Sequence, residues 1–385
     1  MQSNGEKSVG KICQAGTISR KLSPPHHSCI AKQCMGRCGG YTLPFETMIG
    51  SSETTREPPL SSFDFSDFVE HHLVQHKTHA DQGFLEWLVG FAEGDGTFCS
   101  REISLQQPTP SNRETNASTG VGGPAEILLQ STQKLLKRRL LFQLVQKDPK
   151  VLHRIRAELG FGAVRQSGNG AATHWRYTVE DRRGLQRIMA ILNGNLVLPK
   201  RRLQFAEWVN DARGLLWPSF VLKDTGPVAS LETGWLAGFI DAEACFYAHF
   251  TTRSQRSSLS YRLTQKVHIT QQDRCGEAEV LRQVGELLES SARVSLVKPP
   301  DCFRIEVSSL HSHGILVRYL KRFPVIVKAV VFRQWWRVYL LRVERRHLNE
   351  TGILRMRRLC LAMRMKQKEM EAPAGAEGPA PAEAG

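Results

Sequence analysis

The chain has 385 residues, a formal net charge of +15 and a pI near 9.6. Its apolar content of 41% is sufficient for a core, its length allows two or three domains, and no run of about 18 apolar residues predicts a membrane-spanning helix. The excess of Lys and Arg favours a polyanionic partner, because neutralised phosphates release counterions, although a surface of solvated charge would give the same count.

Residues 1–65 are rich in Ser, Pro, Gly and Thr without apolar periodicity, which predicts a disordered extension. The nine cysteines of the chain lack framework spacing and favour a reducing compartment. Cys29, Cys34 and Cys38 form a cluster, separated by four and by three residues. A zinc knuckle prefers a spacing of two, so an unstructured segment is favoured over a metal site there.

A first repeat is predicted over residues 66–215, with a polar insertion at about 104–136. Pro149 lies near the start of one of its helices, and Gly160 follows the end of that helix. The predicted elements are a helix ending at Asp95, strands at 96–103 and 140–147, a helix at 149–159, strands at 164–166 and 175–179, and helices at 184–192 and 201–209.

A linker at 216–230 precedes a second repeat, predicted over residues 231–345, and residues 346–385 are expected to form a basic and then low-complexity tail. The predicted elements of this repeat are a helix ending at Glu243, strands at 246–252 and 261–270, a helix at 275–290, strands at 294–297 and 303–307, and helices at 311–321 and 327–343. The order of elements is the same in both halves. The sequence therefore predicts an α+β fold of two αββαββα repeats.

One motif occurs at the start of both repeats: WLVGFAEGDGTF at 87–98 and WLAGFIDAEACF at 235–246. In a helix, Gly90 and Gly94 lie four residues apart on one face, as do Gly238 and Ala242. Small residues at this spacing allow two helix backbones to approach closely. We therefore expect the two copies to pack against each other across a pseudo-two-fold axis.

Asp95 and Glu243 fall at the C-terminal ends of these helices, where the helix dipole disfavours a carboxylate by about 0.3–1 kcal/mol. Packing the helices together would also bring the two negative charges close to each other. A divalent cation relieves both costs, and carboxylates with the helix-end carbonyls of Gly94 and Ala242 suit Mg²⁺. Gly96 is expected to adopt a left-handed conformation after the first helix.

The motifs at 88–96 and 236–244 resemble those of the LAGLIDADG homing endonucleases, and the resemblance extends over about 84–343. It implies four-stranded antiparallel saddle sheets, one in each repeat, packed through the two motif helices. It implies that Asp95 and Glu243 form a metal-binding catalytic pair, while Glu93 and Asp241 are structural. Ala244 stands where the family prefers Gly, which is expected to strain that helix end slightly.

The family also places a Gln at the end of the second strand of each repeat, which corresponds to Gln146 and Gln271. A basic residue leads into the last helix of each repeat. Lys200 and Lys328 match it when Trp208 is aligned with Trp336. The resemblance implies that these lysines polarise the scissile phosphate or the attacking water. A simple clamp on the DNA backbone is an equal alternative.

The resemblance implies that the two sheets bind DNA, with Arg and Gln side chains on alternate strand positions reading base edges. A one-residue error in register would move any of these side chains to the buried face. The candidates are Arg101, Arg165, Arg176, Arg253, Arg262, Lys266, His268 and Arg304. The basic run at 318–368 is expected to be either a phosphate-contacting helix or arm, or a solvated helix face.

The family implies a monomeric, Mg²⁺-dependent enzyme that makes a staggered break in double-stranded DNA at a long, non-palindromic site. Two alternatives use the same fold: a maturase that binds its own intron RNA, and a non-catalytic DNA-binding regulator. Retention of both Asp95 and Glu243 favours the nuclease. An organellar location, in a chloroplast or mitochondrion, is implied by the family alone.

Overall fold

The structure is a computed structural model that describes residues 62–70, 80–104, 136–168, 173–252, 261–298 and 301–371. These residues belong to one compact unit, which spans Arg56–Gly385. The predictions for the cysteine cluster, for most of the insertion at about 104–136 and for Arg253 lie outside the described residues. Among the helices described, none is long and apolar enough to cross a membrane.

The first repeat contains an antiparallel four-stranded sheet in the order β1-β2-β4-β3. Its elements are α1 Ser66–Glu70, α2 Gln82–Asp95, β1 Gly96–Ser104, β2 Leu136–Gln146, α3 Lys150–Leu159, β3 Ala163–Ser167, β4 His174–Val179, α4 Arg182–Leu192, α5 Pro199–Asp211 and η1 Arg213–Leu215.

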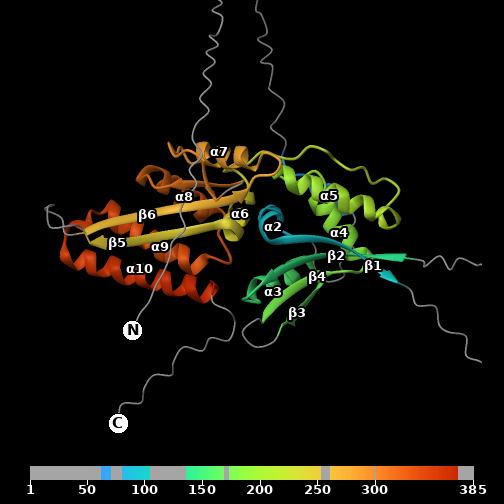
Figure 1. Cartoon of the computed structure of the whole chain (residues 1–385), viewed down its shortest axis with the longest axis horizontal. Helices are drawn as coiled ribbons and strands as arrows, with labels where there is room; N and C mark the ends of the chain where they lie inside the picture. The colour runs from blue at the N-terminus through green and yellow to red at the C-terminus, as the bar shows by residue number, and fades with distance from the viewer. Residues whose placement is uncertain are drawn as a thin grey trace, which may run out of the picture. The chain divides into compact units, whose positions relative to one another are not determined.

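The second repeat contains an equivalent sheet in the order β5-β6-β8-β7 (Figure 1). Its elements are α6 Trp235–Glu243, β5 Ala244–Thr252, β6 Tyr261–Gln272, α7 Glu277–Leu287, β7 Ser295–Lys298, β8 Cys302–Val307, α8 Leu310–Arg322, α9 Ala329–Val343, η2 Arg346–Leu348 and α10 Glu350–Glu371. The predicted α+β fold of two pseudo-symmetric αββαββα repeats is confirmed.

Local sequence signals account for several helix ends. Asp81 begins α2 by accepting a hydrogen bond from the Phe84 N–H, and Asp181 begins α4 in the same way. Gly160, with φ of 76°, ends α3 in the left-handed conformation that glycine adopts without strain. Pro199 lies in the first turn of α5, where its missing N–H costs nothing.

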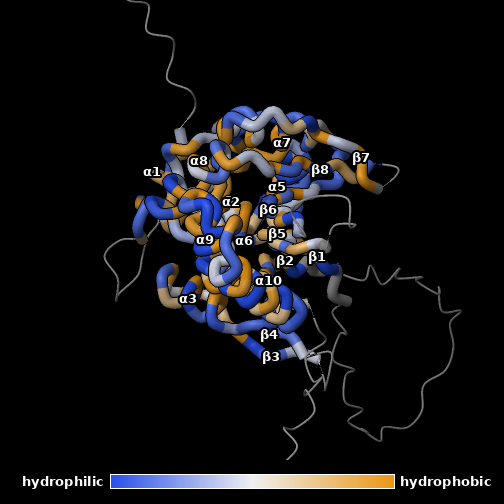
Figure 2. The backbone as a smooth tube through the Cα atoms, turned by 90° about the vertical axis from the view of Figure 1, so that its left-hand side faces the viewer, coloured by the Kyte–Doolittle hydropathy of each residue, from blue (hydrophilic) through white to orange (hydrophobic). Residues whose placement is uncertain are grey.

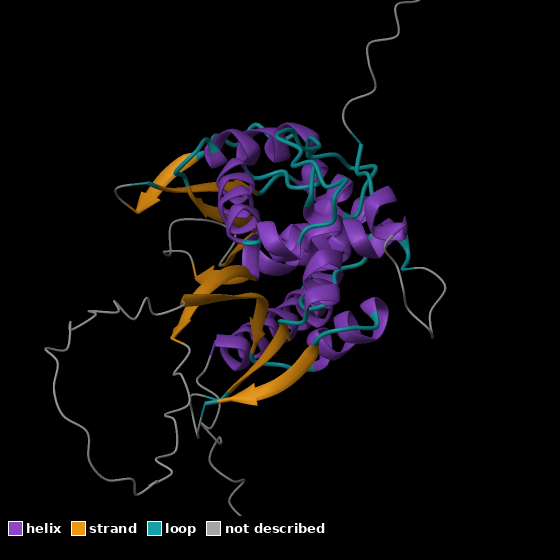
Figure 3. Ribbon diagram, turned by 90° about the vertical axis from the view of Figure 1, so that its right-hand side faces the viewer, coloured by secondary structure: helices purple, strands orange, loops and turns teal. Residues whose placement is uncertain are grey.

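Each sheet has one face covered by helices and one face left uncovered, and Figure 3 shows the helices gathered on one side of the strands. Along β6 the side chains of Gln265, Val267 and Ile269 are buried, while those of Lys266 and His268 between them are partly exposed. This alternation is the period of two that a half-buried strand requires. The uncovered face is therefore polar along β6.

The same aromatic cluster anchors the covered face of each repeat. Phe98 of β1 packs against Trp208 of α5, with ring centroids 5.3 Å apart. Phe246 of β5 packs against Trp335 of α9 at 5.5 Å. Because these rings occupy equivalent places, Trp208 corresponds to Trp335. The predicted alignment of Trp208 with Trp336 is therefore wrong by one residue.

The two motif helices α2 and α6 pack with their backbones in contact, and Figure 2 shows them side by side. A Cβ added to Gly90 would lie 2.1 Å from the Trp235 carbonyl oxygen. A Cβ added to Gly238 would lie 1.8 Å from the Trp87 carbonyl oxygen. Two glycines related by the pseudo-two-fold axis thus permit an approach that no other residue allows.

The two motif helices end differently from what the sequence suggests. Gly96 has φ of −78° and ψ of 149°, and Ala244 has φ of −84° and ψ of 150°. Both residues are extended because each is already the first residue of a strand. The expected left-handed Gly96 and the expected strain at Ala244 are therefore both wrong.

The basic segment after the second repeat forms α10, which packs on α9 and β5. Met356, Cys360 and Met363 recur at helical spacing and are buried. The Gln367 side-chain amide donates a hydrogen bond to the Phe246 carbonyl oxygen at 2.7 Å. The helix thus contributes to the packing of the second repeat.

Substitution of Gly90 or Gly238 by Ala should destabilise the fold by at least about 2 kcal/mol, because the new methyl group would meet rigid backbone rather than a movable side chain. Urea denaturation followed by circular dichroism measures the loss. Gly214→Ala is the matched control, since a Cβ there meets no atom within 4 Å. Equal stabilities of all three variants would contradict the close approach of α2 and α6.

Candidate active site

Asp95 and Glu243 lie at the adjoining ends of α2 and α6, in the last turn of each helix. A Cβ placed on Gly94 would be 3.2 Å from Glu243 Oε1, which shows how closely the helix ends meet. Burial raises the pKa of both carboxyls, and the nearby charge of Asp95 further raises that of Glu243. The site therefore holds two carboxylates in a position that is unfavourable without a cation.

A glutamine side chain hydrogen-bonds to each carboxylate. Gln146, the last residue of β2, donates to Asp95 Oδ2 at 2.7 Å. Gln271, near the end of β6, makes the corresponding hydrogen bond to Glu243 and lowers its pKa. The structure thus brings both predicted glutamines to the acids, one in each repeat.

Lys200 belongs to the first repeat but contacts residues of the second. Its ammonium group donates to Gln271 Oε1 at 2.6 Å and to the Gln272 carbonyl oxygen at 3.3 Å. Its backbone N–H donates to Glu277 Oε1 at 2.8 Å. Since Lys200 occupies the carbonyl end of the Gln271 amide, it leaves the amide nitrogen directed at Glu243.

Lys328 and Arg201 occupy equivalent positions, as the corrected alignment of the aromatic clusters requires. Arg201 donates to the Glu93 carbonyl oxygen at 2.6 Å and to the Gly94 carbonyl oxygen at 2.9 Å. Lys328 donates to the carbonyl oxygens of Ile240 and Ala242, each at 3.0 Å. Each cation therefore satisfies the carbonyls at the end of its own motif helix, where the dipole favours positive charge.

Arg201 is the site residue that the sequence interpretation missed. Two adjacent tryptophans, Trp335 and Trp336, made two alignments possible, and the wrong one placed Lys200 opposite Lys328. Matching Phe205 with Phe332 would have distinguished them, since both rings pack against the equivalent strand phenylalanine. In the corrected register the counterpart of Lys200 is the apolar Val327, so the two halves of the site differ in charge.

The earlier acids of the motifs are buried and hold the repeats in register. Glu93 accepts hydrogen bonds from the Trp235 indole and, at 2.7 Å, from the Leu198 N–H. Asp241 accepts from the Trp87 indole at 3.0 Å and from the Lys328 N–H at 2.8 Å. Each acid thus joins the opposite motif helix to the segment that leads into α5 or α9.

The donor set fits a hard divalent cation that keeps much of its water. In the part of the chain that the structure describes, no three His, Cys, Asp or Glu side chains converge. The available protein ligands are the carboxylates of Asp95 and Glu243 and the carbonyls of Gly94 and Ala242. Each carbonyl already accepts from a cation, yet retains a second lone pair. Mg²⁺ often binds through one or two carboxylates plus substrate phosphate oxygens.

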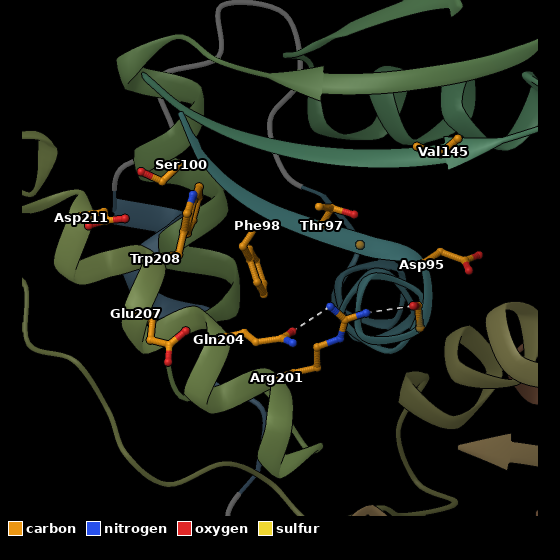
Figure 4. A pocket seen from close by; sticks show the side chains of 12 residues that line it. Asp95, Thr97, Phe98, Ser100, Val145, Arg201, Gln204, Glu207, Trp208 and Asp211 are labelled. Carbon is orange, nitrogen blue, oxygen red and sulfur yellow. Dashed lines mark hydrogen bonds between the residues drawn. The ribbon is translucent and has the colours of Figure 1, made fainter. Parts of the chain in front are cut away.

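Two cavities adjoin Asp95. One of about 690 Å³ lies between β1 and α5 and is lined by Arg201, Gln204, Glu207 and Asp211 (Figure 4). Figure 4 shows the Arg201 guanidinium directed at the end of α2. The other, of about 1340 Å³, lies between the end of β2, the start of α3, Lys328 and the last turns of α10.

The predicted DNA contacts lie on the uncovered faces of the sheets. Arg101, Arg165 and Arg176 alternate with core residues on the first sheet, while Arg262, Lys266, His268 and Arg304 do so on the second. Several are held by neighbours: the Lys266 ammonium lies 2.8 Å from Glu306 Oε1, and Arg304 donates to Thr270 Oγ1 at 2.9 Å. Arg139 shares the uncovered face but was missed because β2 was predicted to begin at 140.

The fold and its paired acids define a two-repeat protein with one composite site between the repeats. The family model described as LAGLIDADG endonuclease matches residues 88–210 and 236–339, more than half of the chain. The chain therefore belongs to the LAGLIDADG endonuclease family, which confirms the resemblance found in the motifs.

Two curated relatives are similar to this chain. A probable intron-encoded endonuclease 4 from Neurospora crassa is 26% identical over 278 residues, covering 70% of this chain and 42% of the relative. The chain thus matches less than half of that protein. An uncharacterized cox1 intron-2 37.2 kDa protein from Schizosaccharomyces pombe is 20% identical over 317 residues, covering 80% of each.

Solved structures share the fold. The meganuclease I-SmaMI bound to uncleaveable DNA has a TM-score of 0.55 and 16% identity, covering 74% of this chain and all of that one. The LAGLIDADG homing endonuclease I-LtrWI bound to target DNA has a TM-score of 0.54 and 17% identity. This match covers 73% of this chain and 97% of that chain. The confirmed architecture includes the two sheets and the central helix pair.

The buried Glu93 carboxyl should make stability depend on pH. Burial raises its pKa from 4.5 to about 7, so the folded chain binds this proton more tightly than the unfolded chain between these values. This contribution is complete below about pH 4.5 and is lost as pH rises through about 7. Urea midpoints measured from about pH 5 to pH 8 should fall with pH, and Glu93→Gln should reduce the fall. The same pH dependence of stability in Glu93→Gln as in the wild type would contradict a raised pKa of Glu93.

Proposed function

We propose that this protein is a site-specific homing endonuclease that cleaves both strands of a long, non-palindromic DNA target in a divalent-cation-dependent reaction, as a monomer with an internal pseudo-two-fold axis. The single observation that carries the proposal is the pairing of Asp95 and Glu243 at the contact between α2 and α6. Both carboxylates are half-buried and lie beside each other, with glutamines, lysines and an arginine around them. DNA-bound relatives of the same fold support a DNA substrate for this chain.

In this proposal Asp95 and Glu243, with the carbonyls of Gly94 and Ala242, hold Mg²⁺ or another divalent cation. When bound, the cation neutralises charge on the scissile phosphate and lowers the pKa of water. Gln146 orients the Asp95 carboxylate through its hydrogen bond.

Lys200 and Gln271 act together on the other half of the site. The hydrogen bond from Lys200 fixes the amide of Gln271, which in turn positions Glu243. Lys328 and Arg201 place positive charge beside the acids, where it stabilises charge that develops on the phosphate. Burial lowers the pKa of both Lys200 and Lys328.

The seven described residues predicted to contact DNA would line one continuous polar surface, formed by the uncovered faces of the sheets. The site acids lie between the two sheets, at the starts of β1 and β5. This arrangement suits duplex DNA, which presents two scissile phosphates related by an approximate two-fold axis. The differing halves suit a non-palindromic target.

A maturase that binds its own intron RNA, and a regulator without catalysis, remain alternatives on the same fold. The acid pair favours the nuclease, because two carboxylates facing a phosphate backbone would weaken simple binding. A relative described as a cox1 intron-2 protein supports an organellar, mitochondrial location for this chain.

Asp95→Asn and Glu243→Gln should each reduce cleavage by at least about a hundredfold while binding to the cognate duplex is retained, because each change removes a charge that holds the cation. Cleavage is measured on a duplex that carries the uninterrupted exon junction of the host gene, and binding by fluorescence anisotropy. Glu207→Gln, an acid in the neighbouring cavity, is the control and should cleave normally. Normal cleavage of both strands by either site variant would refute the assignment.

Lys200→Met should slow cleavage of one strand by at least about tenfold relative to the other, because it releases Gln271 and leaves Gln146 undisturbed. The nicked intermediate should accumulate in a time course on a supercoiled plasmid that carries the site. Lys223→Met, a change of the same kind in the linker, should leave the ratio of the two rates unchanged. Equal slowing of both strands would show that the Lys200–Gln271 contact does not act on one half of the site.

A further inference from the structure

Helix α10 lies along the outer edge of the second sheet, beside β5 (Figure 1). Arg364 donates a hydrogen bond to His249 Nδ1, and the Gln367 amide bonds the Phe246 carbonyl oxygen at 2.7 Å. The Arg357 guanidinium lies 4.1 Å from the centre of the Tyr261 ring. Contacts at both ends of an eleven-residue stretch of α10, from Arg357 to Gln367, therefore attach the helix to the β5–β6 hairpin.

A basic stripe on α10, defined as Arg357, Arg364 and Lys368, is exposed and runs along the edge of this sheet at β5. These residues are seven and four positions apart, which places them on one side of a helix. His249, the partner of Arg364, alternates along β5 with the buried Phe246 and Ala248, so it belongs to the uncovered face. Through Arg364 the stripe thus adjoins the surface on which the predicted DNA contacts lie.

The first repeat has no such helix among its described residues. The equivalent edge, at β1, borders the cavity of about 690 Å³ whose lining includes Glu207 and Asp211. The counterpart of Asp211 on α9 is the apolar Val338, which is fully buried. The edge of the first sheet at β1 therefore borders an acidic cavity, whereas the edge of the second sheet at β5 is covered by the basic helix α10.

We propose that α10 is a DNA-backbone clamp specific to the second repeat. Its basic stripe binds phosphates of the duplex that flanks the half-site beneath the second sheet. Because phosphate contacts carry no sequence information, the clamp adds affinity to any duplex and extends the contact on one side of the target. The inference rests on the proposed DNA-binding function, which it deepens by adding a contact surface outside the two sheets.

Two double variants with the same charge change test the clamp. Arg357→Gln/Arg364→Gln removes two charges of the basic stripe, and Arg355→Gln/Arg358→Gln removes two exposed charges from the opposite flank of α10. Dissociation constants of the full chain are measured from low to moderate salt, on the uninterrupted exon-junction duplex and on a shuffled duplex of equal length.

The stripe variant should lower the slope of log K against log salt by about 1.8 and weaken binding about tenfold on both duplexes, since each phosphate contact contributes about 0.9 to the slope. Arg357→Lys/Arg364→Lys keeps the charge and should retain the wild-type slope. Ethylation interference should show lost phosphate contacts at one end of the target only.

Equal slopes for the stripe variant and the control variant would overturn the clamp, even if the wild type binds and cleaves its target. Loss of the wild-type slope in the Lys variant, with a native circular dichroism spectrum, would also overturn it. Absence of binding by the wild type to either duplex would instead overturn both the clamp and the proposed function.

Discussion

Backbone contact between α2 and α6 at Gly90 and Gly238 is the constraint on which the rest of the structure depends. The contact joins the two repeats, whose buried residues form one hydrophobic cluster. It also places the ends of the two motif helices side by side, and thereby brings Asp95 and Glu243 together. The Trp87 indole donates a hydrogen bond to Asp241, and the Trp235 indole donates one to Glu93. Each bond links one motif helix to the buried acid of the other and stabilises the same helix pair. Stability and the candidate site therefore arise from one interface.

This interface concentrates unfavourable charge, and the surrounding residues offset it. The carboxylates are desolvated and repel each other, which raises the pKa of Glu243. Arg201 and Lys328 place cations at the helix ends, where they bond carbonyls that would otherwise lack partners. Arg201 and Lys328 thus offset part of the negative charge of the carboxylates, and a divalent cation with its phosphate ligand would offset the rest. Lys200 acts on one half alone, so the site is only approximately symmetric.

Much of the fold was predictable from the sequence because the repeated motif and alternating strands carry local periodic signals. The positions of Asp95 and Glu243 follow from the motif, and those of Gln146 and Gln271 are implied by the resemblance to the family. The role of Arg201 did not, because its contacts join segments more than a hundred residues apart and adjacent tryptophans left the register ambiguous. The conformation of Gly96 was also mispredicted, since it depends on the strand that follows the helix. The packing of α10 depends on an edge strand that composition does not reveal.

In the proposed function, the paired carboxylates form one cation-dependent site for both DNA strands. The most direct measurement uses the full chain and a duplex that carries the uninterrupted exon junction, labelled at both 5′ ends, with Mg²⁺ or with EDTA. Denaturing gels should show both strands cut a few base pairs apart in Mg²⁺ and neither strand cut in EDTA. Tight binding in Mg²⁺ without cleavage of either strand, or equal cleavage in EDTA, would contradict the account.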